Sequence, residues 1–238
     1  MTPELEALRL SDWYPDDGRQ VGVDFASPAQ VARYDASQRS TDAAAATLLD
    51  ELGLRPGQAM ADFGCGTGVL VCQAALKGCT AHAVDISAAM LQATLERARA
   101  LGATGVVPQQ AGFLGFQLPA ASLDLATTQY ALHHLDDVWK GVALQRLHAV
   151  LKPGGTLLLR DVVYSCEPAA LKATLDDWLQ WMQAERGYSR DENLTHVRDE
   201  HSTFDWILQG LIERAGFRIE QARHARGVYA TYFCRRPA

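Results

Sequence analysis

The sequence predicts an α/β fold with a doubly wound, mostly parallel sheet that ends in an antiparallel C-terminal hairpin strand. Three observations support this prediction. Apolar stretches typical of buried strands alternate with helical stretches from residue 58 to residue 163, a glycine-rich turn follows the first of them, and two further strand-like stretches flank Gly227. Such alternation with short connections is typical of a parallel sheet covered by helices on both faces. The 238 residues, 48% of them hydrophobic, suffice for the core of one large domain.

The first half of the predicted sheet lies between residues 58 and 110. Residues 58–63 form a short apolar run that stops at Gly64, as expected of a strand buried on both faces. Ser87 is a typical helix N-cap and Gly102 a typical helix stop, so together they bracket a helix. The predicted elements are a strand at 58–63, a helix at 67–77, a strand at 80–86, a helix at 87–101 and a weaker strand at 105–110.

The second half continues this rhythm and then departs from it. The predicted elements are a strand at 123–130, a helix at 136–151, a turn at 152–155, a strand at 156–163, a helix at 169–186, a polar irregular stretch at 188–201, a helix at 204–215, and strands at 217–223 and 229–235. This makes a Rossmann-like sheet of seven strands. Because right-handed connections bring the carboxyl ends of the parallel strands to one edge, we expect ligands to bind there.

We interpret residues 1–238 as a single domain with two additions. No stretch rich in Gly, Pro or Ser divides the chain, and no segment is repeated. Residues 1–50 lack strand patterning and are predicted to form an N-terminal helical cap. Residues 165–202 are predicted to form a helical and loop insertion that acts as a lid over the substrate.

Composition and charge narrow the kinds of partner. A net charge of −6 disfavours a nucleic-acid partner. No apolar run approaches the roughly 18 residues of a transmembrane helix, and the N-terminus lacks the apolar stretch of a signal peptide. The five cysteines form no CxxC pair. These observations predict a cytoplasmic monomer or homodimer with reduced thiols, no membrane contact and a small-molecule substrate.

The glycine loop at residues 64–68 is the main candidate ligand site. It follows a strand that ends in Asp62, and its spacing is GxGxG. A dinucleotide-binding loop would have its third glycine at the position of Val69, whose side chain is too large for close helix packing. Asp85 ends the next strand, where a carboxylate can accept hydrogen bonds from both hydroxyls of a ribose. The pattern therefore favours a nucleoside ligand with a ribose and an amino-acid tail over a dinucleotide.

Four segments, in the same order along the chain, carry a resemblance to a known family. They are residues 62–70, the ribose motif Ala83-Val84-Asp85-Ile86-Ser87, the fourth-strand motif from Leu123-Asp124-Leu125 to His133-His134, and the turn Leu151-Lys152-Pro153-Gly154-Gly155. The chain resembles the class I S-adenosyl-L-methionine (AdoMet)-dependent methyltransferases, specifically the small-molecule group of the ubiquinone/menaquinone-methyltransferase type, over about residues 30–165. The resemblance implies AdoMet as cofactor and methyl transfer to an O, N or C nucleophile of a small, partly apolar molecule.

The resemblance also implies a set of cofactor contacts. Ile86 and Met90 would pack on the adenosine, and Phe113 would stack on the adenine ring. Many members of the family have an aspartate where Gly112 stands, so the chain departs from the pattern at that contact. The implied cofactor residues are Tyr34, Asp62, Gly64, Cys65, Gly66, Gly68, Asp85, Ile86, Met90, Gly112, Phe113, Thr128 and Gln129.

Polar side chains at the carboxyl ends of the fourth and fifth strands are candidates for the reaction itself. His133 or His134 could act as a general base, since imidazole titrates near neutral pH. The alternative is that one of them caps the next helix and the other packs beneath it, because methyl transfer often needs only the positioning of two reactants. Asp161 is a third catalytic candidate, and Tyr130 and Tyr164 are candidates for substrate contact.

Two further patterns leave alternatives open. Trp178 and Trp181 share a helix face, which suits an aromatic substrate platform or, more commonly, core packing. His196 and His201 flank acidic residues but lack the spacing of a helical metal-binding pair, so we predict no metal site.

Two other functions fit part of the pattern. An AdoMet-binding protein without methyl transfer would carry the same motifs. A nicotinamide-dependent oxidoreductase would also have a glycine loop, but Val69 and the C-terminal hairpin count against it.

Overall fold

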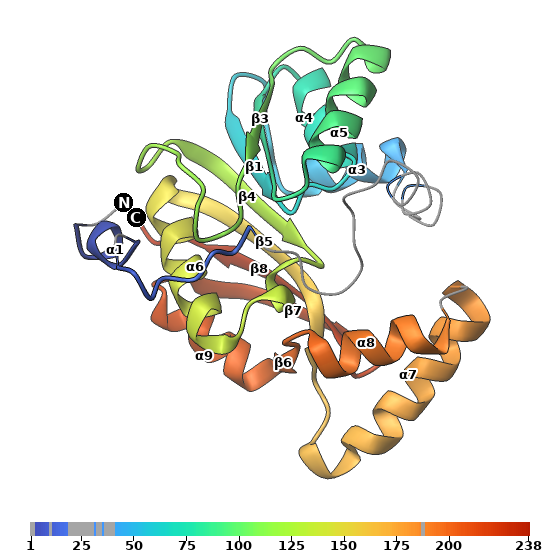
Figure 1. Cartoon of the computed structure of the whole chain (residues 1–238). Helices are drawn as coiled ribbons and strands as arrows, with labels where there is room; N and C mark the ends of the chain where they lie inside the picture. Colours follow the sequence, from blue (N-terminus) through green and yellow to red (C-terminus); the bar gives the residue numbers. More distant parts are fainter. Residues whose placement is uncertain (1–2, 10, 19–30, 32–34, 36–40, 187–188) are drawn as a thin grey trace.

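The computed structural model describes residues 3–9, 11–18, 31, 35, 41–186 and 189–238. Its centre is a sheet in the order β3-β2-β1-β4-β5-β8-β7, with a short eighth strand, β6, paired with β5 (Figure 1). The strands are β1 (Ala59–Phe63), β2 (Thr80–Asp85), β3 (Val106–Gln110), β4 (Leu123–Gln129), β5 (Leu151–Tyr164), β6 (Thr203–Phe204), β7 (Arg218–Ala225) and β8 (Tyr229–Arg235). The strand order reverses between β1 and β4, and ligands of open α/β sheets bind at such a point.

The predicted α/β fold is confirmed, including its antiparallel C-terminal strand. The pairs among β1, β2, β3, β4 and β5 are all parallel, whereas β8 is antiparallel to both β5 and β7. The sheet contains β6 in addition to the seven predicted strands. This strand is two residues long, too short to show an apolar pattern in the sequence.

Helices cover both faces of the sheet (Figure 1). Met60 and Ala61 point to opposite faces, as neighbours in a strand do. Met60 packs with α3, α4 and α5, and Ala61 with α6 and α9. No helix in the described part of the chain is both long and apolar enough to cross a membrane. The helices of these layers are α3 (Asp42–Glu51), α4 (Val69–Leu76), α5 (Ala88–Leu101), α6 (Asp137–Val150) and α9 (Asp205–Arg214), and a short α1 (Pro3–Arg9) precedes them.

The predicted boundaries of α5 agree with the structure. The Ser87 hydroxyl accepts a hydrogen bond from the backbone N–H of Met90 at 3.2 Å, which satisfies one of the free donors of the first turn. Gly102 ends the helix with a φ of 68°, in the left-handed region that glycine adopts without strain. Both signals are local, so the sequence alone was sufficient to predict them.

Two predictions for the later part of the chain need correction. Residues 188–201 were expected to be irregular, but α8 (Arg190–Asp199) occupies most of this stretch and pairs with α7 (Leu171–Arg186) beside the sheet (Figure 1). A capping box starts α8, in which Ser189 and Glu192 bond each other's backbone N–H groups. The predicted turn at residues 152–155 lies inside β5, where it bulges out of the pairing with β4.

Candidate active site

The glycine loop connects β1 to α4 at the carboxyl edge of the sheet. Gly64, Gly66 and Gly68 have φ values of 74°, 55° and 78°, which L side chains rarely adopt. A Cβ at position 64 would overlap the side chain of Ala131, and one at position 68 would overlap Thr94. The loop is therefore packed closely on both sides, and it lies directly against the segment that follows β4.

Asp85 is fixed against this loop. Its carboxylate accepts a hydrogen bond from the backbone N–H of Gly66 at 2.9 Å through Oδ2, and another from Ser87 at 2.8 Å through Oδ1. Burial, which leaves the residue 9% exposed, raises the pKa of Asp85, although these hydrogen bonds oppose the shift. The loop and the end of β2 thus form one unit. Of the two predicted adenosine contacts beyond it, Met90 is buried in the first turn of α5 and Ile86 is half-buried.

Asp62 lies at the other side of the loop, near the end of β1. It is buried, and the hydroxyl of Thr127 on β4 donates a hydrogen bond to its Oδ1 at 2.6 Å. Burial raises the pKa of Asp62 to about 7, against this hydrogen bond, and the charge of Asp85 adds to the rise. A cationic ligand group beside Asp62 would restore its negative charge. Cys65, predicted beside the cofactor, is buried in the core beneath α4.

The end of β4 brings three predicted residues together. The Thr128 hydroxyl is buried and has no hydrogen-bond partner within the described residues. Gln129 accepts a hydrogen bond from the Arg160 guanidinium at 3.0 Å. Tyr130 is 47% exposed and has a φ of 56°, a strained conformation for a residue other than glycine. Strained backbone and an unsatisfied hydroxyl next to the glycine loop are both typical of a ligand site.

The structure differs from expectation at Gly112 and Phe113. The Phe113 ring packs into the core on Phe63, with 6.1 Å between ring centroids, and is 8% exposed. A Cβ at Gly112 would overlap the carboxylate of Asp17, which accepts a hydrogen bond from the backbone N–H of Leu114 at 2.6 Å. A carboxylate from the N-terminal segment therefore occupies the space that a side chain at position 112 would fill. No local pattern in the sequence connects Asp17 with this loop.

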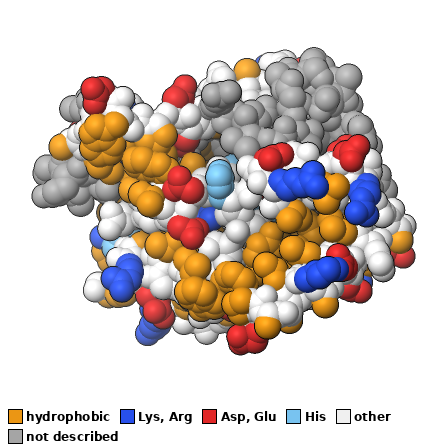
Figure 2. Space-filling model, turned by 60° about the horizontal axis from the view of Figure 1, so that its bottom comes forward, with side chains coloured by type: hydrophobic (Ala, Val, Ile, Leu, Met, Phe, Trp, Pro, Cys, Tyr) orange, Lys and Arg blue, Asp and Glu red, His pale blue; other side chains and the backbone are white. Residues whose placement is uncertain are grey.

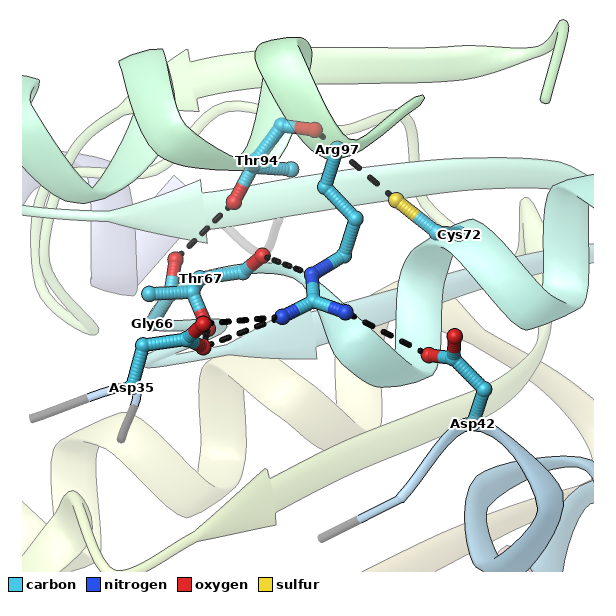
Figure 3. A network of polar contacts seen from close by, with 7 residues as sticks. All are labelled: Asp35, Asp42, Gly66, Thr67, Cys72, Thr94 and Arg97. Atoms are coloured by element: carbon cyan, nitrogen blue, oxygen red, sulfur yellow. Dashed lines mark hydrogen bonds and ion pairs between the residues drawn. The ribbon is translucent and has the colours of Figure 1, made fainter. Parts of the chain in front are cut away.

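The N-terminal segment also contacts the glycine loop. The Thr67 hydroxyl donates to Asp35 at 2.5 Å, and the Arg97 guanidinium bonds both the Thr67 carbonyl at 3.1 Å and the Asp35 carboxylate at 3.0 Å. Arg97 also reaches Asp42 at the start of α3, at 3.4 Å (Figure 3). Arg97 thus joins α5, α3, the loop and Asp35, a role that sequence reasoning missed. The predicted cofactor residue Tyr34 lies outside the described residues.

His133 is the centre of a buried ionic cluster after β4. Its Nδ1 lies 2.5 Å from Asp161 Oδ1, its backbone N–H donates to Asp161 Oδ2 at 2.9 Å, and its Nε2 lies 3.1 Å from Glu200 Oε2. Burial opposes a charge on the ring, but the two carboxylates outweigh it and raise the pKa of His133 to about 9. His133 also offsets the burial of Asp161, whose pKa is lowered. Both ring nitrogens of His133 therefore have acidic partners.

His134 differs from its neighbour. Its ring lies 4.4 Å from that of His133 between centroids, and its Nδ1 is buried without a hydrogen-bond partner in the described segments. Burial, with the charge on His133, lowers the pKa of His134 to about 4. His134 is therefore neutral at pH 7. The three predicted catalytic residues, His133, His134 and Asp161, are brought to one place.

Glu200, just after α8, completes the cluster and was not predicted as a site residue. Besides His133 it contacts Nδ1 of His196, whose ring lies 5.0 Å from the His133 ring and 5.3 Å from that of Trp178. The His201 side chain is exposed, and only its backbone N–H joins the cluster, by donating to the His133 carbonyl at 2.8 Å. The S-x-x-E capping signal of α8 would have located this helix, but not its approach to β4.

The remaining candidates lie around the same end of the sheet. Tyr164, a predicted substrate contact, is buried at 8% exposure and packs edge-on against Phe204, with 6.0 Å between centroids. Trp178 is fully buried, and its indole N–H donates to the Tyr229 hydroxyl at 2.9 Å, which favours the core-packing alternative for this residue. Trp181 is half-buried, under the guanidinium of Arg226.

The comparisons with known proteins agree with this geometry. Residues 60–155 match the model of a methyltransferase domain family. An uncharacterised methyltransferase of Geobacillus thermodenitrificans is 27% identical over 193 residues, which are 81% of this chain and 84% of that protein. A SAM-dependent methyltransferase of Aquifex aeolicus has the same fold, with a TM-score of 0.62 at 17% identity over 88% of this chain and 98% of that one. Phosphoethanolamine N-methyltransferase 2 of Haemonchus contortus, solved with S-adenosylhomocysteine, has a TM-score of 0.65 at 17% identity, over 89% and 58% of the two chains.

Fold, glycine loop and domain match agree with one another: residues 60–155 match a methyltransferase domain, and the chain has the fold of the class I AdoMet-dependent methyltransferases. The narrower resemblance to the ubiquinone/menaquinone-methyltransferase group stays a prediction.

Proposed function

We propose that the chain transfers a methyl group from AdoMet to an O, N or C nucleophile of a small, partly apolar molecule. The observation that carries this proposal is the attachment of Asp85 to the glycine loop through Gly66, because it holds a buried carboxylate against the loop, where it would accept hydrogen bonds from a ribose. The reaction forms a bond between the acceptor atom and the methyl carbon while the carbon–sulfur bond of the sulfonium breaks. The leaving group is already activated, so the protein contributes mainly orientation and exclusion of water.

The cofactor would lie along the carboxyl edge of β2, β1 and β4. Asp85 would accept hydrogen bonds from the ribose hydroxyls, and Asp62 would hold the ammonium group of the methionine part. The N-terminus of α4 would face the carboxylate of the same part, since free backbone N–H groups and the helix dipole favour an anion. The unsatisfied hydroxyl of Thr128 would contact the methionine part from the β4 side. The other proposed cofactor residues are Tyr34, Gly64, Cys65, Gly66, Gly68, Ile86, Met90 and Gln129. Phe113, whose ring packs in the core, and Gly112, whose side is covered by Asp17, are not retained.

The acceptor would lie beside the carboxyl ends of β4 and β5, with residues 165–202 as its lid and residues 1–50 as a cap on the cofactor side. His134, whose Nδ1 has no partner in the described chain, is the group of the histidine cluster best placed to face it. His133 and Asp161 would act by positioning, because they bond each other and the remaining ring nitrogen of His133 lies beside Glu200. Tyr130 and Tyr164 would contact the acceptor from the strand ends. Hydrophobic side chains cover much of one face of the molecule, with acidic, basic and histidine side chains between them (Figure 2).

Thermal unfolding of the full chain with each candidate ligand tests the cofactor part. AdoMet and S-adenosylhomocysteine at about 1 mM should raise the midpoint, since a ligand that binds only the folded state stabilises it. NAD at the same concentration should not, as expected from Val69. Release of S-adenosylhomocysteine with pooled hydroxyl, amine and activated-carbon acceptors then tests transfer. A chain stabilised by NAD but by neither of the other ligands would contradict the proposal.

A further inference from the structure

The buried histidine cluster has the composition and geometry of a metal site. We propose that His133, His134 and Glu200 bind a divalent transition-metal ion of the zinc type at the carboxyl ends of β4 and β5. The sequence alone led to the opposite prediction, which considered His196 and His201 on a stretch then thought irregular. The proposal goes beyond methyl transfer, since the ion could bind whether or not the chain turns over AdoMet.

The three ligand atoms are already gathered. One atom each from His133, His134 and Glu200 lie within 4.8 Å of one another, and Nε2 of His133 is 3.1 Å from the Glu200 carboxylate. Zinc bonds to nitrogen and oxygen are about 2.0–2.2 Å long, so ligand atoms in a tetrahedral site stand about 3.3–3.5 Å apart. Small movements of the three side chains would bring the ligand atoms from their present separation to this spacing.

The His134 ring provides an independent indication. Its Nδ1 is buried and has no hydrogen-bond partner in the part of the chain that the structure describes, and the ring contributes one nitrogen to the cluster. A buried polar atom without a partner costs about 1–3 kcal/mol, which a bond to a metal ion would remove.

The surroundings of the ligands match those of metal sites in general. Metal-binding histidines usually donate their second ring N–H to a carboxylate, which orients the ring. Asp161 takes this position toward Nδ1 of His133 at 2.5 Å, and is itself held by the backbone N–H groups of His133 and Val162. Nδ1 of His196 contacts the same Glu200 oxygen, Oε2, that lies near His133, and so helps to fix that carboxylate.

Charge also balances at this site. Two buried carboxylates, Asp161 and Glu200, surround the histidine rings, and together they offset the two positive charges of the ion. Binding displaces the proton that His133 Nε2 shares with Glu200, and that proton leaves to solvent. Two nitrogens and one carboxylate leave a fourth tetrahedral position open, as in catalytic zinc sites.

The open position gives the ion a use in the proposed reaction. An acceptor hydroxyl bound there would lose its proton more readily, because a divalent cation stabilises the resulting oxyanion. This step rests on the proposed function and narrows the acceptor to one with an oxygen near the transferred methyl group.

Calorimetric titration of the chelator-treated full chain with Zn²⁺ tests the site. We expect one ion per chain with a Kd on the order of 1 μM or below, and no heat with Mg²⁺, which prefers all-oxygen ligands. Glu200→Gln and His134→Gln should each weaken zinc binding at least tenfold. Glu220→Gln is the matched control, because Glu220 pairs only with surface arginines among the contacts described for it, and its binding should equal that of the unmodified chain.

Two further measurements distinguish loss of the metal site from loss of the fold and from loss of the cofactor site. His134→Gln removes no hydrogen bond of the described structure, so its unfolding midpoint should stay near that of the unmodified chain even if Glu200→Gln is less stable. Titration of AdoMet on the same samples reports the cofactor site independently of the metal. Absence of zinc binding by the unmodified chain, or equal binding by all three variants, would overturn the metal site and leave the proposed function standing.

Discussion

The two halves of the proposed site are built in different ways. The cofactor half, around the glycine loop and Asp85, depends on backbone conformation and backbone N–H donors within two short segments of the chain. The acceptor half, around His133, depends on side chains that come from β4, β5 and the end of α8. Because it relies on backbone geometry, the cofactor half should tolerate few backbone changes. It should not depend on residues 165–202. The acceptor half should depend on how α8 packs, and so can differ between related chains of the same fold.

The largest expected effect is on the cofactor half alone. Asp85→Ala should weaken AdoMet binding about 100-fold or more, because it removes two hydrogen-bond acceptors for the ribose and leaves the N–H groups of Gly66 and Ser87 unpaired. Calorimetric titration with AdoMet measures this. Asp50→Ala is the control, since Asp50 is an exposed partner of Lys77 far from the loop, and it should bind normally. Zinc binding should be the same in both variants. If Asp85→Ala lost affinity for both AdoMet and zinc, the two halves would not be independent.

The contrast between the halves also shows what could be predicted from the sequence. The caps of α5, the glycine turn and the buried strands follow from local rules, and these elements were predicted to within a few residues. The contact of Glu200 with His133, the reach of Asp17 to Gly112 and the link from Arg97 to Asp35 join distant segments. Such contacts depend on how segments before and after the parallel strands dock on the sheet, which no local pattern encodes. The helix α8 was missed although its capping box was present, because its polar composition outweighed that signal.

A smaller effect, on stability, is expected in the acceptor half. Asp161→Asn should lower the free energy of unfolding by about 3 kcal/mol, because it removes one of the two charged partners of the buried His133 and leaves only Glu200. Asp205→Asn is the matched control: Asp205 also pairs with a histidine, His224, at 3.0 Å, but at a half-exposed position. It should lose less than about 1 kcal/mol. Chemical denaturation measures both variants. Equal losses would mean that burial does not distinguish the two His–Asp pairs.

AdoMet binding by Asp161→Asn tests whether the cofactor half is independent of the acceptor half. The cofactor half makes no use of Asp161, so the Kd for AdoMet should change less than about twofold in the range where the variant stays folded. A large loss of AdoMet affinity would show that the two halves are coupled through the contact between Gly64 and Ala131.

The smallest effect is the pH dependence of cofactor binding. Burial raises the pKa of Asp62 to about 7, so this carboxyl is half protonated in the free protein at neutral pH. The ammonium of AdoMet binds the ionised form, and it stays charged below pH 7 because α-amino groups titrate near pH 8. Affinity should therefore fall about fivefold from pH 7 to pH 6, as the ionised fraction falls from about one half to about one tenth.

The same carboxyl makes the stability of the free protein change with pH in the opposite direction to the affinity for AdoMet. An acid whose pKa is raised on folding makes the folded state progressively less stable as pH rises from about 4 to about 7, because the unfolded chain releases the proton more easily. Asp62→Asn removes this ionisation and keeps an acceptor for the Thr127 hydroxyl. It should bind AdoMet more weakly at pH 7 with a flat pH profile, yet unfold at a higher denaturant concentration than the unmodified chain at that pH. If the variant lost both affinity and stability at pH 7, Asp62 would be ionised in the free protein. Burial would then raise the pKa of this carboxyl by less than its position at the glycine loop indicates.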